Sequence, residues 1–178
     1  MDPSQDVRTW ARATAAVLCE RGKAAGREPD MAALRKELRS RTEDSRARDP
    51  LYAFALCPDG FDSALALLEV DLIHPDDVVP RITLDWVAER FSARDFGPPR
   101  ISWHDLPAGP AVRIRQNFAA DDPPREGPGI LLETLTYGVL PTGTESAVVL
   151  LASWTMPGIG DVLEAAADHI ARTLVVES

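Results

Sequence analysis

The pentapeptide Leu106-Pro107-Ala108-Gly109-Pro110 separates two runs of strand-like composition, Ile101–Leu106 and Ala111–Phe118. Proline fixes φ and glycine tolerates positive φ, so this stretch predicts a turn between two paired strands. Two later runs, Ile130–Val139 and Ala147–Met156, are almost continuously apolar. Such runs are typical of strands covered on both faces, and these two runs predict the middle of a sheet.

Helical patterns lie on both sides of these runs. Thr83–Phe91 places its apolar residues on one helical face, and Asp161–Leu174 begins with Asp161 and Glu164 at the spacing of a capping box. We expect the C-terminal helix to pack across the central strands. The apolar residues expected on its buried face are Val162, Leu163, Ala166, Ile170 and Leu174.

The N-terminal third has a different pattern. Val7–Gly22 carries a broad apolar stripe at helical spacing, and a second helix with a narrower stripe follows Pro29. Between Arg39 and Pro50 almost every residue is charged or polar, which indicates a linker. The sequence therefore predicts a helical arm over residues 1–48 and a second domain over residues 51–178.

Two more strands are expected at the start of that second domain. Leu51–Leu56 is short and apolar, and the second half of Ala64–Ile73 alternates apolar with acidic residues. Ala119–Gly129 lacks apolar periodicity and is expected to be a loop. The fold class predicted is α+β, a mainly antiparallel sheet of about six strands flanked by helices, with an N-terminal helical arm.

Charge is distributed unevenly over the 178 residues. The net charge is −9, and residues 1–50 contain 11 Lys and Arg against 9 Asp and Glu, whereas residues 51–178 contain 8 against 19. An acidic body repels nucleic acid and anionic membranes, so neither is expected as a partner. A basic protein partner is one interpretation; the other is a charge that serves only solubility.

No targeting or cofactor signal stands out. The first residues, Met1–Asp6, are acidic where a signal peptide is basic, and no run of about 18 apolar residues occurs. A cytoplasmic location is therefore expected. Cys19 and Cys57 match no metal or redox spacing, which favours buried free thiols and predicts no metal and no cofactor.

The order of elements after residue 50 resembles that of a known family. Two strands, a short helix, four strands and a C-terminal helix, with the stretches Leu106–Arg113 and Ala165–Leu174, are similar to the PsbP-like α/β/α sandwich. Actinobacterial relatives of the lipoprotein LpqN resemble the chain in the same way, over about residues 51–175. The resemblance implies a binding module, assembly factor or secretion chaperone more than an enzyme, and it implies no fixed chemistry.

Few residues suggest catalysis. His74-Pro75-Asp76-Asp77 has donors for a divalent cation, but a strand-ending turn in which an aspartate caps the next helix is the favoured interpretation. His169, beside Asp168, is expected on the surface. The nucleophile elbow, the phosphate loop, the dinucleotide fingerprint and the H-E-x-x-H motif do not occur in the sequence.

Four residues are the candidates for binding. Arg113 and Arg115 share one strand face, as a clamp for a carboxylate or phosphate or as a solvated face paired with nearby acids. The four tryptophans, Trp10, Trp86, Trp103 and Trp154, are more typical of the core than of a contact surface. If one is exposed, we expect it to be Trp103, because its strand is predicted near a sheet edge. His104 then points to the opposite face of that strand.

The leading hypothesis is a non-catalytic cytoplasmic protein-binding module: an adaptor, a secretion chaperone or an immunity-type partner. A homodimer through the N-terminal helices is a related expectation. The alternative is a small-ligand-binding protein with a pocket between the sheet and the helices at 83–91 and 161–174. A third hypothesis, an enzyme that uses His104 or the cluster at His74, Asp76 and Asp77, ranks last.

Overall fold

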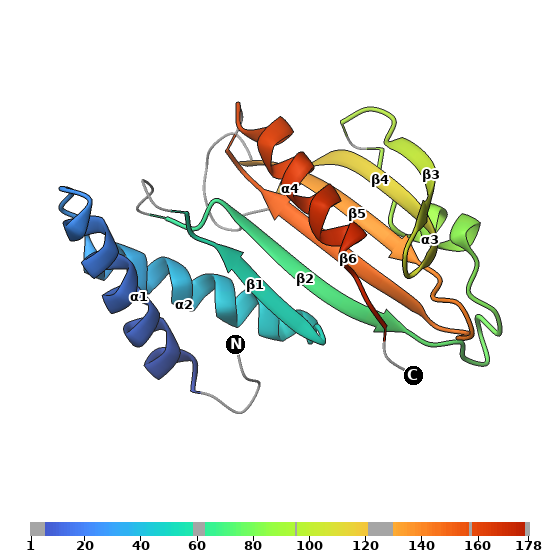
Figure 1. Ribbon diagram of the computed structural model, residues 1–178, viewed down its shortest axis with the longest axis horizontal. Coiled ribbons are helices and arrows are strands. Elements are labelled where there is room, and N and C mark those ends of the chain that lie inside the picture. Colours follow the sequence, from blue (N-terminus) through green and yellow to red (C-terminus); the bar gives the residue numbers. More distant parts are fainter. Residues whose placement is uncertain (1–5, 59–62, 95, 121–129, 157, 177–178) are drawn as a thin grey trace. The chain divides into compact units, whose positions relative to one another are not determined.

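The structure is a computed structural model that describes residues 6–58, 63–94, 96–120, 130–156 and 158–176. Its four helices and one six-stranded antiparallel sheet confirm the α+β class (Figure 1). The strand order is β1-β2-β6-β5-β4-β3, so β1 and β3 form the two edges. The chain divides into two compact units, Met1–Glu69 and Val70–Ser178. The domain division expected between residues 48 and 51 stays a prediction.

Unit 1 contains two helices that pack on each other, α1 (Val7–Ala24) and α2 (Met31–Arg48). Each begins at an aspartate, because the side chains of Asp6 and Asp30 accept hydrogen bonds from backbone N–H groups of the first turn. Small residues bring the helices close together. The buried cluster between them consists of Ala11, Ala15, Cys19, Leu34 and Leu38.

Helix α2 runs to Arg48, so the prediction of a linker from Arg39 onward was wrong. The short polar residues Thr42 and Ser45 are buried and continue the narrow stripe of Leu34 and Leu38. On the exposed side, Arg39 pairs with Glu43 at 2.7 Å, one turn further along the helix. Pairs at this spacing stabilise a helix, and they explain why such a polar stretch is helical.

The strands of unit 1 follow α2. Strand β1 covers Tyr52–Leu56, and β2 covers Ala66–Ile73, with the division between the two units falling inside β2. The carbonyl of Leu56 accepts a hydrogen bond from the N–H of Leu65 at 2.9 Å. Arg48 ends α2 with a two-point hydrogen bond to the buried Glu69 of β2, at 2.7 and 3.0 Å.

Unit 2 contains four consecutive antiparallel strands: β3 (Arg100–Leu106), β4 (Gly109–Ala120), β5 (Ile130–Val139) and β6 (Ala147–Trp154). The predicted hairpin is confirmed, with Leu106 paired to Gly109. Gly109 has a φ of 146°, and a Cβ there would lie 2.2 Å from the carbonyl oxygen of Leu140, so only glycine is tolerated. Residues 121–129 of the expected loop lie outside the described residues, and residues 119 and 120 end β4.

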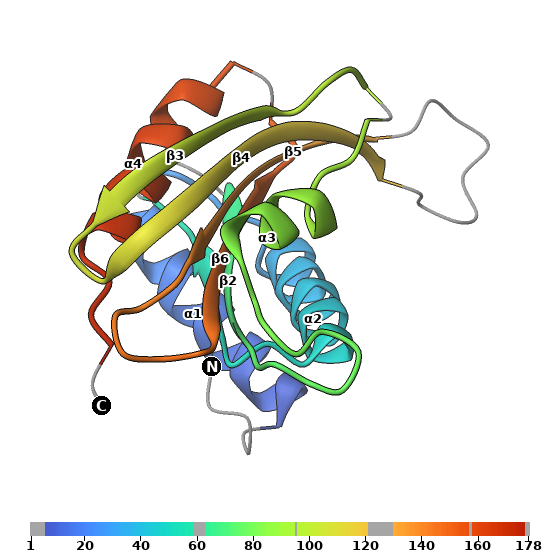
Figure 2. The same ribbon diagram turned by 90° about the vertical axis from the view of Figure 1, so that its right-hand side faces the viewer.

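Two helices cover opposite faces of the unit 2 strands, α3 (Leu84–Arg90) and α4 (Gly160–Arg172) (Figure 2). Val87 of α3 approaches Gly138 of β5 so closely that a Cβ at Gly138 would lie 2.3 Å from its Cγ1 atom. The core on this face is therefore tightly packed. Its buried members are Ile82, Val87, Ala88, Val112, Ile114 and Ala147.

Helix α4 corrects two expectations. Its N-cap is Ile159, which makes no side-chain capping bond, so the capping box predicted from Asp161 was wrong. Glu164 instead binds an arginine of the sheet. The buried positions are Leu163, Ala167 and Ala171, whereas Val162 is 70% exposed and Ile170 is also exposed. The helix is rotated relative to the expected stripe because its polar side chains meet the sheet.

Candidate functional site

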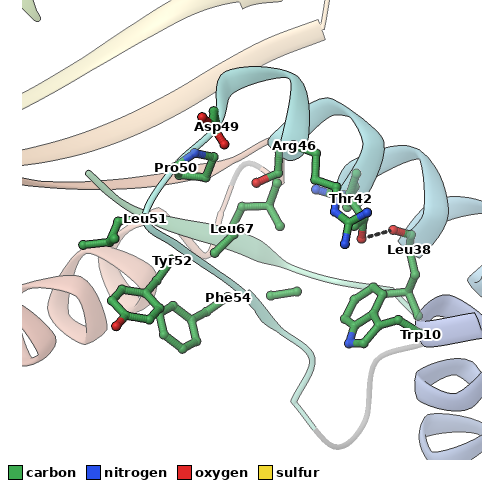
Figure 3. Close-up of a pocket in the computed structure, with 14 residues that line it drawn as sticks. Trp10, Leu38, Thr42, Arg46, Asp49, Pro50, Leu51, Tyr52, Phe54 and Leu67 are labelled. Atoms are coloured by element: carbon green, nitrogen blue, oxygen red, sulfur yellow. Dashed lines mark hydrogen bonds between the residues drawn. The ribbon is translucent and has the colours of Figure 1, made fainter. Parts of the chain in front are cut away.

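The candidate site lies within unit 1, where a pocket of about 260 Å³ opens between α2 and β1 (Figure 3). Trp10 of α1, Leu38 of α2 and Leu67 of β2 contribute apolar surface to it. Residues Tyr52 to Ala55 of β1 form another part of the lining. We call this the apolar pocket.

The strand beside the apolar pocket exposes large apolar side chains. Tyr52 is 59% exposed and Phe54 55%, and Leu51 and Leu56 are exposed as well. The two aromatic rings stack at a centroid distance of 6.4 Å. Edge strands normally carry charged residues or proline, which prevent pairing with other chains, but β1 contains neither.

Two of the polar residues that line the apolar pocket are already engaged within unit 1. The hydroxyl of Thr42 donates to the Leu38 carbonyl at 2.7 Å, and Arg41 pairs with Glu37 at 2.8 Å. The lining residues include no histidine or cysteine. The arrangement provides a site for an apolar side chain.

The predicted binding residue Arg113 faces α4 and is hydrogen-bonded inside unit 2. Its Nε donates to Asp168 at 2.9 Å, and its Nη2 donates to Glu164. Asp168 also accepts a hydrogen bond from the hydroxyl of Tyr137 at 2.8 Å. This guanidinium therefore meets carboxylates of its own chain.

Arg115, two residues further along β4, is also surrounded. It donates to Glu133, lies within 3.4 Å of Glu164, and stacks 4.8 Å from the ring centre of Trp154. The indole N–H of Trp154 donates to the same Glu133 carboxylate at 3.2 Å. We call the seven residues of this cluster the charge network: Arg113, Arg115, Glu133, Tyr137, Trp154, Glu164 and Asp168.

The charge network shifts the pKa values of its members. Burial lowers the pKa of Arg113, but the hydrogen bonds to Asp168 and Glu164 outweigh it, so the net shift is upward. Burial and the hydrogen bond to Asp168 raise the pKa of Tyr137 to about 12. Burial raises the pKa of Asp168, but the hydrogen bonds from Arg113 and Tyr137 outweigh this effect, so the pKa lies below its usual value. Together these shifts favour a charged Arg113, a neutral Tyr137 and an ionised Asp168.

The other two predicted binding residues lie on β3. Trp103 is 58% exposed, which confirms the expectation of an exposed tryptophan near a sheet edge. The Nε2 atom of His104 lies 2.8 Å from the hydroxyl of Ser102, and its ring centre lies 6.2 Å from that of Tyr137. Alternation along β3 directs Trp103 to the other face, so the four candidates do not converge on one point.

The residues considered for metal or acid–base chemistry serve local structure. The Nδ1 atom of His74 lies 2.8 Å from the hydroxyl of Ser146, and Asp76 accepts hydrogen bonds from the N–H groups of Val78 and Val79. The expectation that an aspartate here caps the next helix was wrong, because the N-cap of α3 is Thr83. His169 is exposed on α4. Across the described ranges, no three His, Cys, Asp or Glu side chains are grouped as metal ligands would be.

The residues of the apolar pocket were not singled out from the sequence. Trp10 was assigned to the core, and Tyr52 and Phe54 were assigned to an ordinary strand. A usable signal was present, because Tyr52–Leu56 contains no charged residue and no proline. A strand of this composition at a sheet edge indicates an interface.

Comparisons with known proteins give little. No protein-family model matches the chain, and no curated protein matches it. A crystal structure of a protein of unknown function, PA94 from Pseudomonas aeruginosa, is similar at a TM-score of 0.49 and 15% identity, over 71% of this chain and 83% of that one. Among the helices in the described part, none combines the length and the apolar character needed to cross a membrane.

Proposed function

We propose that the protein is a non-catalytic binding module that holds an apolar segment of another protein at β1 and the apolar pocket. The observation that carries the proposal is the unprotected edge: Tyr52 and Phe54 are more than half exposed on a strand without charge or proline. Burying a large apolar side chain contributes about 1.5–3 kcal/mol, so these two rings are strong anchors for a partner.

Strand addition is the binding mode that suits this edge. As the last strand in the sheet order, β1 directs one set of backbone N–H and C=O groups away from β2. An extended partner segment pairs with these groups, and its alternate side chains reach the apolar pocket or the Tyr52–Phe54 stack. Backbone pairing supplies affinity in this mode, and the apolar pocket supplies selectivity.

The cellular role within the proposal is an adaptor, a secretion chaperone or an immunity-type partner in the cytoplasm. Cys19 and Cys57 are free thiols, which agrees with a reducing compartment. The resemblance of the sequence to PsbP-like sandwiches also supports a binding role. A homodimer through α1 and α2, and a basic partner for the acidic body, remain predictions.

The proposal is tested with a charge placed on the edge strand. The variant Phe54→Asp introduces a charge where a partner strand would pack, and its matched control, Val78→Asp, adds the same charge at an exposed apolar residue of unit 2. Partners captured from the native host by the wild-type chain are identified, and their affinities for all three proteins are measured.

We expect Phe54→Asp to weaken binding about a hundredfold, the size of a lost hot spot, while Val78→Asp binds like the wild type. Circular dichroism should show both variants folded. Equal affinity of all three proteins for every captured partner would contradict a role for β1.

A small-ligand-binding function is the second candidate, and the apolar pocket itself favours it. Its volume of about 260 Å³ is close to the lower end of ligand sites, which span about 300–1,000 Å³. It lies in unit 1, away from the position expected between the sheet and the helices at 83–91 and 161–174. A thermal-shift screen that finds a stabilising apolar compound, lost in Leu38→Trp, would favour this candidate.

A further inference from the structure

We propose that a second site, the groove between α1 and α2, binds an acidic segment of a partner protein. This groove, of about 620 Å³, is lined by Arg8 and Arg12 of α1 and by Arg35, Lys36 and Arg39 of α2. The remaining lining residues are small, a threonine and two alanines, and no acidic side chain lines it. We call it the basic groove.

The cations of the basic groove are largely without partners in the chain. Within the described ranges, Arg12, Arg35 and Lys36 take part in no ion pair and no side-chain hydrogen bond, and all three are exposed. Arg39 pairs with Glu43 at 2.7 Å. Arg8 lies near Asp6, whose carboxylate caps α1.

Elsewhere on the two helices, basic side chains do meet acids. Arg41 pairs with Glu37 at 2.8 Å, and Lys23 pairs with Glu20 at the same distance. Unpaired cations are therefore concentrated at the groove, where they repel one another in the free protein. An anionic occupant removes that repulsion and is therefore attracted to the groove. Because the charges are exposed, salt screens this attraction and weakens the affinity.

The spacing of the cations suits carboxylates carried by a polypeptide. Arg8 and Arg12 are one helical turn apart, as are Arg35 and Arg39, so two rows with a period of about 5–6 Å face the groove. Acidic side chains one turn apart on a helical segment have the same period. The small residues between the rows leave room for its backbone.

Nucleic acid suits the groove less well. No aromatic side chain lines it for base stacking, which is the contact that single-stranded nucleic acid uses most. A second copy of this chain is the competing occupant, because residues 51–178 contain 19 Asp and Glu, and a measurement of self-association separates the two.

This inference does not rest on the proposed function. The residues that line the basic groove and those that line the apolar pocket do not overlap. If Phe54→Asp does not affect partner binding, the proposal for the basic groove still stands. If the basic groove binds no acidic segment, the proposal for β1 and the apolar pocket still stands.

The test uses the full chain and a decaglutamate peptide as the acidic probe, with fluorescence anisotropy as the readout. The variant Arg35→Glu/Lys36→Glu reverses two groove charges. Its control, Arg81→Glu/Arg90→Glu, makes the same change at exposed arginines of unit 2. Arg12→Gln serves as a milder variant on α1 in case the double variant is unfolded.

We expect the wild type and the control to bind the peptide, with an affinity that falls as salt rises. Affinity should fall about tenfold in Arg35→Glu/Lys36→Glu and severalfold in Arg12→Gln. The proposal is overturned if the wild type does not bind, or if the groove variants bind as well as the control. It is also overturned if a single-stranded oligonucleotide of equal charge binds more tightly, or if the groove charges prove to drive self-association.

Discussion

The two units differ in which side chains they bury and which they expose. In unit 2, the arginines of β4 are charged residues inside a packed structure, and each is matched by carboxylates from β5 or α4. In unit 1, the aromatic residues of β1 are apolar residues at a surface, and their rings remain exposed. The two arginines of β4 resemble a binding site in the sequence, but carboxylates of the same chain already pair with them. The aromatic side chains of β1 have no such cover and remain exposed.

The first prediction concerns the core that supports the exposed strand. Leu38 is 1% exposed and belongs to the α1–α2 cluster. Leu38→Ala should lower the free energy of unfolding of unit 1 by about 3 kcal/mol, because it removes buried methyl groups and leaves a cavity. Urea denaturation followed by circular dichroism measures the change.

Met31→Ala is the control for Leu38→Ala, since Met31 lies on the same helix but is exposed. Its cost should stay below about 1 kcal/mol. If Leu38→Ala costs no more than its control, unit 1 has no rigid core of its own, and the contrast with unit 2 is lost.

The second prediction concerns the charge network. Asp168→Ala removes the acceptor of both Arg113 and Tyr137 and leaves a largely buried guanidinium with one fewer carboxylate. Because Glu164 still pairs with Arg113, we expect a loss of about 2 kcal/mol, less than for a pair broken completely. Asp161→Ala, at an exposed position of the same helix, should cost well under half of that. Equal costs would show that the network adds nothing.

The third prediction uses the tyrosines. The chain has two, so Tyr52→Phe leaves Tyr137 as the single tyrosine, and its ionisation can be followed by ultraviolet absorbance. It should titrate at about pH 12. Asp168→Asn should lower this pKa, because it removes a negative charge that opposes phenolate formation.

The same shifts determine how stability depends on pH. The pKa of Tyr137 is higher in the folded state, so its contribution is complete below the unfolded value of about 10 and is lost as pH rises toward 12. The pKa of Asp168 is lower in the folded state, so its contribution is present above about pH 4 and disappears in acid. The urea midpoint of unfolding is compared between the wild type and Asp168→Asn across this pH range. If the two proteins show the same pH dependence in acid and in alkali, this assignment is contradicted.

Most of the fold could be predicted from the sequence because local patterns and packing agree there. The hairpin around Gly109 follows from turn chemistry, and the central strands follow from their continuous apolar runs. Helix α2 was missed beyond Arg39 because its buried positions are short and polar, Thr42 and Ser45, and hydrophobic periodicity does not register them. The rotation of α4 was missed for a related reason, since Glu164 binds Arg113 and does not cap the helix.

The candidate site was harder to predict because its parts come from distant segments. Trp10, Leu38, Phe54 and Leu67 meet only in the folded unit, and each alone reads as a core residue. The basic groove was missed in the same way, since its cations come from two separate helices. Sequence distance explains both omissions.

The burial of Trp154 gives the protein an optical signature. Its indole is 1% exposed and is held between Arg115 and Glu133, whereas Trp103 of the same unit is largely in solvent. Shielded and hydrated indoles emit at different wavelengths, so the emission spectrum of unit 2 should contain a blue component and a red one. In a chain that carries Trp10→Phe and Trp86→Phe, so that only Trp103 and Trp154 emit, loss of the blue component reports the moment when α4 leaves the sheet, without any added label.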